Sequence, residues 1–201
     1  MTNEKVLFLG PADAPLRAWL QAQGNEVVQT EAAVSADVIA DAGFTFLVSH
    51  GYRHILRRDV LELFAGRAVN LHISYLPWNR GADPNLWSFV DDTPKGVTIH
   101  RIDEGVDTGD ILVQEEVRLE VGDTLATSYA KLQSSIQDLF RRSWEQIRTG
   151  ELPGRPQPAG GSRHRLRDRV ALADLLADGW DTPVSTLRGQ GLPGGDVGAS
   201  R

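Results

Sequence analysis

The sequence contains no cysteine, and its apolar runs are short. Without thiols the chain has no disulfide, no thiolate nucleophile and no zinc or iron–sulfur site held by cysteine. Apolar runs such as residues 6–9 are far shorter than the ~20 residues that a membrane-spanning helix needs. The start of the chain also lacks a basic segment followed by an apolar stretch. We therefore expect a cytoplasmic protein without a membrane partner.

Positive charge is also scarce. The chain carries 21 Lys and Arg against 27 Asp and Glu, so its formal net charge is −6. This balance argues against a nucleic-acid partner, because affinity for nucleic acids depends largely on neutralising phosphates with Lys and Arg. Walker, GxSxG and HExxH motifs are absent, which removes the common signals of nucleotide hydrolases, serine hydrolases and zinc proteases.

What the chain does contain is an alternation of short apolar runs with helical patterns. Runs typical of strands occur at residues 5–9, 26–29, 44–49, 68–73, 96–101 and 111–117. Helical spacing occurs at residues 16–20 and 60–64, and again from 124 to 148, where Asp123 and Thr124 suit a helix cap. The alternation predicts an α/β fold with a mixed, mainly parallel sheet flanked by helices. The chemistry should then lie at the carboxyl ends of the strands.

The composition changes near residue 150. Half of the residues from 149 to 162 are Gly or Pro, which is typical of a chain leaving a compact domain. We therefore expect a catalytic domain at residues 1–150. Residues 151–188, called the C-terminal extension below, should form a linker, an Arg-rich stretch and a weak helix at 170–177. Residues 189–201 should form a disordered tail.

Two polar clusters stand out within the expected domain. Asn70, His72 and Ser74 alternate along one predicted strand, so their side chains share a face. A polar row on a central strand either forms a working site or consists of hydrogen-bonded core residues that fix the following loop.

The second cluster consists of polar residues where another strand opens into an acidic loop containing glycines. Its members are His100, Asp103, Glu104 and Asp107. A solvated turn is the alternative interpretation. The spacing is unlike that of tight zinc sites, so we expect no metal.

Taken together and in order, these motifs resemble the folate-dependent formyltransferase family. The resemblance covers about residues 5–148, and it rests on Asn70-Leu71-His72, Leu76-Pro77, residues 96–100, residues 103–111 and Gln114. It implies a formyltransferase-type Rossmann-like domain with Asn70, His72 and Asp107 as the catalytic residues. It also implies that 10-formyltetrahydrofolate is the formyl donor, with its pterin held by the backbone of two loops. The matching positions are Tyr52, Arg53, His54, Ile55 and Leu56 in one loop and Asp103, Glu104, Gly105 and Val106 in the other.

The residue types suit this chemistry. Moving a formyl group from a folate nitrogen to an amine develops an oxyanion, so the site needs fixed hydrogen-bond donors and a proton carrier but no metal. Asn70 and His72 can supply these functions. Asp107 can orient the His72 ring and stabilise its imidazolium form.

Residues 75–88 resemble the small formyltransferases that act on nucleotide-linked amino sugars, where the loop after the catalytic His meets the acceptor. The resemblance places Trp78, Asn79, Arg80, Gly81 and Asn85 at the acceptor. The favoured acceptor is a sugar nucleotide bearing a primary amine, such as a dTDP-4-amino-4,6-dideoxyhexose. The Arg-rich stretch at 162–169 either clamps its diphosphate, together with Arg80, or is a charged surface. A homodimer is a further expectation from the family.

Other acceptors and one non-enzymatic role stay open at this stage. Glycinamide ribonucleotide, an amino acid or a secondary-metabolite precursor could each supply the amine. Methionyl-tRNA is disfavoured by the negative charge. A folate- or nucleotide-binding module without activity is the alternative from a different class, although the intact trio speaks against it.

Overall fold

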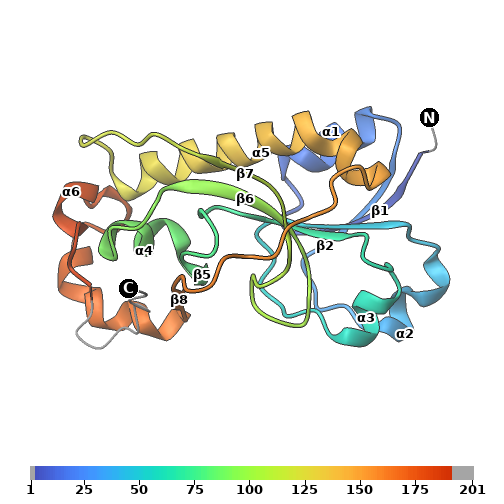
Figure 1. Cartoon of the computed structure of the whole chain (residues 1–201), viewed down its shortest axis with the longest axis horizontal. Coiled ribbons are helices and arrows are strands. Elements are labelled where there is room, and N and C mark those ends of the chain that lie inside the picture. The colour runs from blue at the N-terminus through green and yellow to red at the C-terminus, as the bar shows by residue number, and fades with distance from the viewer. Residues whose placement is uncertain (1–2, 192–201) are drawn as a thin grey trace.

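The computed structural model describes residues 3–191, and its main element is a six-stranded sheet in the order β2-β1-β3-β4-β6-β7 (Figure 1). Strands β1 (Lys5–Leu9), β2 (Glu26–Thr30), β3 (Phe46–Ser49) and β4 (Ala68–His72) run parallel to one another. Strands β6 (Gly96–Arg101) and β7 (Ile111–Glu116) are antiparallel to their neighbours. The predicted mixed, mainly parallel sheet and its six strands are confirmed.

Each face of the sheet packs against its own helices. On one face lie α1 (Pro15–Ala22) and the 25-residue helix α5 (Leu125–Thr149), which runs along the sheet in Figure 1. Alternation along β1 turns Val6 and Phe8 toward these helices and Leu7 toward the opposite layer. Apolar side chains on both faces of the strand are buried, which explains its continuous apolar run.

Capping residues in the sequence fix both ends of helix α5. Thr124 and Thr127 form a reciprocal capping box, in which each side-chain oxygen accepts a hydrogen bond from the other residue's backbone N–H. Gly150 ends the helix with a φ of 76°, a conformation that favours glycine. Trp144 packs edge-on against Phe46 of β3, with ring centroids 5.0 Å apart. The helix predicted at 124–148 is therefore confirmed as a cover of the sheet.

The opposite face has a shorter cover. It consists of α2 (Ala36–Ile39), the 3₁₀ turn η1 (Ala40–Ala42) and α3 (Arg58–Glu62). The helical pattern at 60–64 predicts this helix, but α3 begins and ends two residues earlier, at Arg58 and Glu62. These short helices pack on β1, β3 and the start of β4, around Leu7, Leu47 and Ala68.

The C-terminal extension packs against the rest of the molecule. Its strand β8 (Arg163–His164) pairs in parallel with β5 (Arg80–Gly81). The 3₁₀ helices η2 (Leu166–Leu176) and η3 (Gly179–Asp181) and the turn α6 (Val184–Leu187) follow. Leu172, Val184 and Leu187 bury the apolar side of α4 (Pro84–Val90), and Figure 1 shows the orange and red extension beside α4 and the start of α5. Residues 170–177 belong mostly to η2, so a 3₁₀ helix replaces the expected weak helix.

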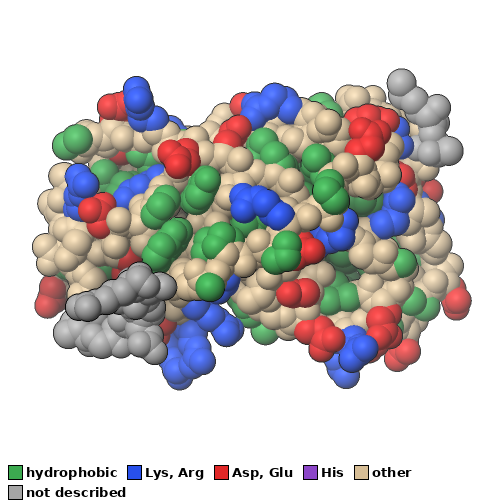
Figure 2. Space-filling view, viewed as in Figure 1, with side chains coloured by type: hydrophobic (Ala, Val, Ile, Leu, Met, Phe, Trp, Pro, Cys, Tyr) green, Lys and Arg blue, Asp and Glu red, His purple; other side chains and the backbone are tan. Residues whose placement is uncertain are grey.

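Two surface features follow from this arrangement. Figure 2 shows Lys and Arg side chains gathered beside β8 and η2, where Arg163, Arg165 and Arg167 are exposed. Among residues 3–191, no helix has both the length and the apolar character needed to span a membrane. The expected tail lies outside the described residues from 192 onward.

Candidate active site

Strands β4 and β6 place three polar side chains on one face of the sheet. Asn70 lies directly opposite His100 in the antiparallel pair, and His72 lies opposite Thr98. Their face is the one that α2 and α3 cover only in part. His72 and His100 are nevertheless 7% and 2% exposed, because the loops above them close over the strands.

One of these loops returns Asp107 to the strand face. Asp107 has a φ of 55°, and Gly109 lies so close to the Arg101 carbonyl that a Cβ atom there would collide with it. Asp103 stabilises the turn by accepting hydrogen bonds from the Gly105 N–H and the Thr108 hydroxyl. Asp103 therefore has a structural role within the loop.

The Asp107 carboxylate is the centre of the cluster. Its Oδ1 accepts a hydrogen bond from Asn70 Nδ2 at 3.0 Å, and its Oδ2 accepts one from the Gly81 N–H at 2.8 Å. His72 Nδ1 is 3.6 Å from Oδ2, and His100 Nε2 is 3.4 Å from Oδ1. Burial raises the pKa of Asp107, but the positive charges that His72 and His100 carry when protonated, together with the Gly81 N–H, outweigh it and hold this pKa well below its ordinary value. Asp107 is therefore ionised.

The His72 ring has one nitrogen committed and one available. Its Nε2 lies 3.0 Å from the Asn79 carbonyl oxygen, which can only accept, so Nε2 carries the hydrogen. Nδ1 then faces Asp107. Burial lowers the pKa of His72 from 6.5, although Asp107 raises it in part. At neutral pH, His72 is a neutral imidazole with a free lone pair on Nδ1.

His100 and Asn70 complete the network. His100 Nδ1 donates to the Arg101 carbonyl at 2.7 Å, so neutral His100 presents Nε2 as an acceptor. Asn70 Nδ2 lies 3.2 Å from this Nε2 and 3.0 Å from Asp107 Oδ1. Both amide hydrogens of Asn70 thus have partners. To donate to a substrate oxygen, Asn70 must give up one of these bonds, and the bond to His100 is the longer.

The C-terminal extension supports the acidic loop through Gln157. Its amide nitrogen donates to the carbonyls of Asp107 and Gly109 at 2.8 and 2.9 Å. Its Oε1 accepts two hydrogen bonds from the Arg80 guanidinium. One amide therefore joins the extension, the acidic loop and β5, which carries the Gly81 N–H. A Cβ atom on Gly81 would collide with the His164 carbonyl of β8, so only glycine fits this pairing.

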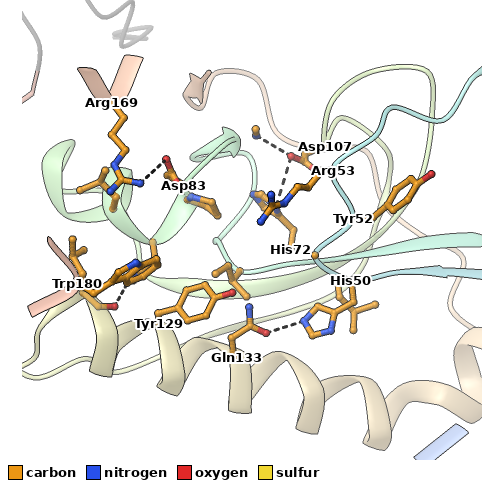
Figure 3. Close-up of a pocket in the computed structure, with 18 of the residues that line it drawn as sticks. His50, Tyr52, Arg53, His72, Asp83, Asp107, Tyr129, Gln133, Arg169 and Trp180 are labelled. Carbon is orange, nitrogen blue, oxygen red and sulfur yellow. Dashed lines mark hydrogen bonds and ion pairs between the residues drawn. The ribbon is translucent and has the colours of Figure 1, made fainter. Parts of the chain in front are cut away.

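Two cavities meet at this cluster. The larger has a volume of about 730 Å³ and lies between the loops at 52–56 and 102–107 and the Arg163–Arg169 part of the extension. The smaller, of about 360 Å³, extends from His50 past His72 to Trp180. Asn70, Gly81 and Asp107 line both cavities. In Figure 3, His72 and Asp107 lie between Arg169 and Trp180 on one side and His50 and Tyr52 on the other.

Residues 12–142 match the formyl transferase family, which is more than half of the 201 residues. The chain belongs to the formyl transferase family. The resemblance inferred from the ordered motifs is thereby confirmed.

This formyl transferase is similar to several known proteins. It is 50% identical to the formyltransferase PseJ from Anoxybacillus kamchatkensis, with a TM-score of 0.90 over 94% of this chain and 100% of that one. The PseJ crystal structure contains UDP-4,6-dideoxy-4-formamido-L-AltNAc and tetrahydrofolate. A sugar N-formyltransferase from a Shewanella species shares the fold at 22% identity, with a TM-score of 0.72 over 92% of this chain and 85% of that one.

A methionyl-tRNA formyltransferase from Anaeromyxobacter dehalogenans is 34% identical over 198 residues. That match covers 88% of this formyl transferase and 62% of its relative. The chain therefore spans less than two thirds of the length of this relative.

All but one of the residues expected to bind the formyl donor line the larger cavity. Glu104 does not line it and lies 3.7 Å from Arg58 instead. The residues of this set that line the larger cavity are Tyr52, Arg53, His54, Ile55, Leu56, Asp103, Gly105 and Val106.

The residues expected to bind the amine acceptor fall into two groups. Gly81 and Asn85 line the smaller cavity. Trp78, Asn79 and Arg80 line neither cavity. Asn79 is fully buried. Its side-chain amide donates a hydrogen bond to the Thr93 hydroxyl, and its backbone carbonyl accepts one from His72 Nε2. Arg80 is engaged by Gln157.

Sequence reasoning missed several residues that line the smaller cavity. His50 follows β3, and its Nε2 donates to Gln133 Oε1 of α5 at 2.8 Å. Burial lowers the pKa of His50, and the bond to Gln133 opposes this. At the other end, Tyr129 of α5 packs edge-on against Trp180 of the extension, and Arg169 lines the same cavity. The position of His50 at the end of a strand was a usable signal, and Arg169 belongs to the Arg-rich stretch noted in the sequence, whereas Tyr129 and Trp180 gave no signal.

Within the described part of the chain, no three His, Asp or Glu side chains are grouped to hold a metal ion.

Proposed function

We propose that this formyl transferase moves a formyl group from 10-formyltetrahydrofolate to the primary amine of a nucleotide-linked amino sugar. The observation that carries the proposal is the Asn70, His72 and Asp107 cluster at the meeting point of two cavities, in a chain that matches the whole length of the PseJ structure. The sugar ligand of PseJ suggests a UDP- or dTDP-linked 4-amino-4,6-dideoxyhexose as acceptor.

The larger cavity suits the donor. Leu56 and Ile102 supply apolar surface for a flat ring, and the loop at 103–106 presents backbone groups beside them. Arg53 lines the same cavity and offers a cation to the carboxylates at the far end of a folate. The cavity reaches Asp107 and Asn70, so a formyl group at its inner end meets the cluster.

The smaller cavity suits a polar acceptor. Asn85 is 4% exposed, and its Oδ1 has no hydrogen-bond partner, whereas its Nδ2 donates to the Leu125 carbonyl. Asp83 Oδ2 is likewise buried without a hydrogen-bond donor. Both residues line this cavity. Buried acceptors of this kind are costly unless a ligand supplies donors, and the hydroxyl and amide groups of a sugar can supply them.

The cluster has the groups that the transfer requires. The amine nitrogen attacks the formyl carbon and gives a proton to His72 Nδ1, the free nitrogen of the ring. Asp107 stabilises the imidazolium formed in this way, and Asn70 Nδ2 donates to the developing oxyanion in place of its bond to His100. The bond from the formyl carbon to the folate nitrogen breaks, and that nitrogen takes the proton from Nδ1. The products are a formamide and tetrahydrofolate.

An acceptor panel tests this proposal. Purified protein is mixed with 10-formyltetrahydrofolate and either a UDP-linked amino sugar, glycinamide ribonucleotide, an amino acid or methionyl-tRNA, and tetrahydrofolate formation is followed by absorbance. We expect the sugar nucleotide to give the highest kcat/KM. Faster reaction of methionyl-tRNA, to whose formyltransferase the chain is 34% identical, or of a phosphate-free amine would overturn the choice of acceptor. Absence of tetrahydrofolate with every amine would instead indicate a binding module.

Two further proposals come from the sequence. They are a cytoplasmic location and a homodimer, and light scattering after size-exclusion chromatography tests the second.

A further inference from the structure

The larger cavity is lined by three exposed arginines that have no acidic partner. Arg53 comes from the loop at 52–56, and Arg163 and Arg165 come from the C-terminal extension. Within residues 3–191, no carboxylate forms an ion pair with any of the three, whereas Arg169 faces one and Arg167 has one beside it. A cleft lined by charge of one sign attracts counter-ions. The three guanidinium groups therefore indicate an anionic ligand, in a chain whose net charge is −6.

The acidic residues that line this cavity do not neutralise the three arginines. Asp103 accepts hydrogen bonds within its own loop, and Asp107 is held by the catalytic cluster. Asp83 faces Arg169 at 4.0 Å. Arg163 and Arg165 line only this cavity and not the smaller one, in which the acceptor is placed. The anion that they meet is therefore part of the donor.

Extended backbone turns the side chains of Arg163 and Arg165 to the same side. Arg163 pairs with Arg80 in the ladder between β5 and β8, and Arg165 has φ −107° and ψ 156°. His164 lies between them and turns the other way, where its ring stacks on Trp87. At a rise of ~3.3 Å per residue, the two arginines are about 6.6 Å apart along the strand. Figure 2 shows the Lys and Arg side chains gathered beside β8.

Two exposed aliphatic side chains line the same cavity. Ile55 is 71% exposed and Leu166, the residue after Arg165, is 70% exposed. Such side chains at a cavity wall suit an apolar ring. The donor carries a benzoyl ring between its pterin and its glutamate, so apolar surface next to arginines matches the order of its chemical groups.

We propose that Arg53, Arg163 and Arg165 form a subsite for the glutamate tail of 10-formyltetrahydrofolate, and that the enzyme prefers donors in which this tail is a γ-linked chain of several glutamates. The inference rests on the proposed function for the placement of the donor in the larger cavity. A single glutamate has two carboxylates, and each further γ-linked residue adds one. Since each guanidinium pairs with one carboxylate, three arginines suit a tail of two residues or more.

The spacing of the arginines fits such a chain. A γ-linked glutamate contributes five backbone atoms, one fewer than two α-linked residues in a strand. The carboxylates of the chain therefore recur at nearly the spacing of Arg163 and Arg165. Ile55 and Leu166 then cover the benzoyl ring, and the C-terminal extension becomes one wall of the donor site.

Calorimetric titration of the full chain with a stable analogue of the donor tests the subsite. The probes are 5-formyltetrahydrofolate with one glutamate and the same compound with three. At low salt the triglutamate should bind about tenfold more tightly, which is roughly threefold for each of the two added carboxylates. Added salt should reduce this difference, because it screens exposed ion pairs.

Three double or single variants assign the difference to the arginines. Arg163→Gln combined with Arg165→Gln should remove most of the preference for the triglutamate and change the affinity of the one-glutamate probe far less. Arg163→Lys combined with Arg165→Lys keeps the charge and should keep most of the preference, which separates charge from misfolding of the extension. Arg167→Gln is the matched control and should keep the full preference, because this exposed arginine lines neither cavity.

Several results would overturn the subsite. They are an equal Kd for the two probes in wild-type protein, and an equal loss of affinity for both probes in the double Gln variant. Weaker binding of UDP by this variant, with the preference for the triglutamate unchanged, would assign the arginines to the acceptor instead. The proposed function survives each of these results if wild-type protein formylates a sugar nucleotide from the one-glutamate donor. Failure of wild-type protein to bind either probe would overturn the proposed function together with the subsite.

Discussion

Asp107 shows how single residues create the site. Its carboxylate is almost completely enclosed, and burial alone would favour the neutral acid. The charge of the two nearby histidines in their protonated forms, together with the hydrogen bond from the Gly81 N–H, reverses that preference. The carboxylate is therefore a fixed negative charge beside a neutral imidazole. This arrangement is suited to stabilising an imidazolium that exists only during the reaction.

The first prediction concerns this charge. Asp107→Asn keeps the shape of the side chain and removes the charge, so turnover should fall by roughly a hundredfold or more while the fold persists. Initial rates at saturating donor and acceptor, with circular dichroism as the folding check, provide the measurement. Asp110→Asn is the matched control in the same loop, because Asp110 lines neither cavity. Turnover within a few-fold of wild type in Asp107→Asn would remove this carboxylate from the mechanism.

The second prediction concerns the pKa of His72. Since burial lowers this pKa below 6.5 and Asp107 partly raises it, His72 should titrate below 6.5 and lower still in Asp107→Asn. The free base on Nδ1 is needed for catalysis, so kcat/KM should stay constant from pH 8 to about 6.5 and fall as the pH drops through the His72 pKa. NMR titration of the imidazole measures the shift. His50 is the internal control, because its partner is Gln133 and its titration should not respond to Asp107→Asn. A His72 pKa above 6.5 would contradict the structure.

At the scale of elements, Gln157 gives the C-terminal extension a positioning role. Its side-chain nitrogen donates hydrogen bonds to two loop carbonyls, and its side-chain oxygen accepts two from Arg80. The Asp107 backbone has a positive φ, which is unfavourable for a residue other than glycine, so an external clamp on its carbonyl is physically useful.

The third prediction removes this clamp. Gln157→Leu should lower kcat about tenfold with little change in the KM of either substrate, because the loop keeps its cavity wall but holds Asp107 less accurately. Gln146→Leu, on the exposed side of α5, is the matched control. A rise in KM without a fall in kcat would show that Gln157 shapes a binding surface instead.

The elements also show what sequence patterns can and cannot predict. Strands such as β1 and β4 are readable because burial on both faces leaves a continuous apolar run, and the polar exceptions Asn70 and His72 mark the site. Helix α4 was not predicted, since Pro84 and Asn85 resemble a loop and its apolar face is matched by a distant partner, Leu187. His100 was noted with the acidic loop, but its position beside Asn70 follows from the strand register and could not be predicted from spacing.

At the scale of the whole molecule, composition marks the C-terminal extension as a linker, yet it packs against α4 and pairs with β5. His164 stacks on Trp87 at 3.9 Å and bonds to Asp91, which fixes β8 against α4. Contacts between residues so far apart in sequence leave no local pattern, because each glycine or proline in the extension is compatible with a free linker as well. Trp180 was missed for the same reason.

The fourth prediction compares two truncations. Ending the chain after Arg188 should leave the Tm and kcat nearly unchanged, because the Gly-rich residues beyond it contain little apolar area to bury. Ending it after Gly150 should abolish activity and lower the Tm strongly, since it uncovers the apolar face of α4 and removes Gln157. Thermal denaturation and turnover of the two proteins provide the measurement. A stable, active chain ending at Gly150 would show that the first 150 residues are a self-sufficient catalytic domain.

The central claim is that the formyl group leaves folate and reaches the amine of a nucleotide-linked sugar at the Asp107 cluster. The most direct measurement uses 10-formyltetrahydrofolate labelled with ¹³C in its formyl group, a UDP-linked 4-amino-4,6-dideoxy sugar, and mass spectrometry of the sugar nucleotide. We expect wild-type protein to convert the acceptor to its labelled formamide, and Asp107→Asn to do so at least about a hundredfold more slowly. An unlabelled sugar nucleotide alongside a labelled phosphate-free amine, or equal labelling by both proteins, would contradict the account.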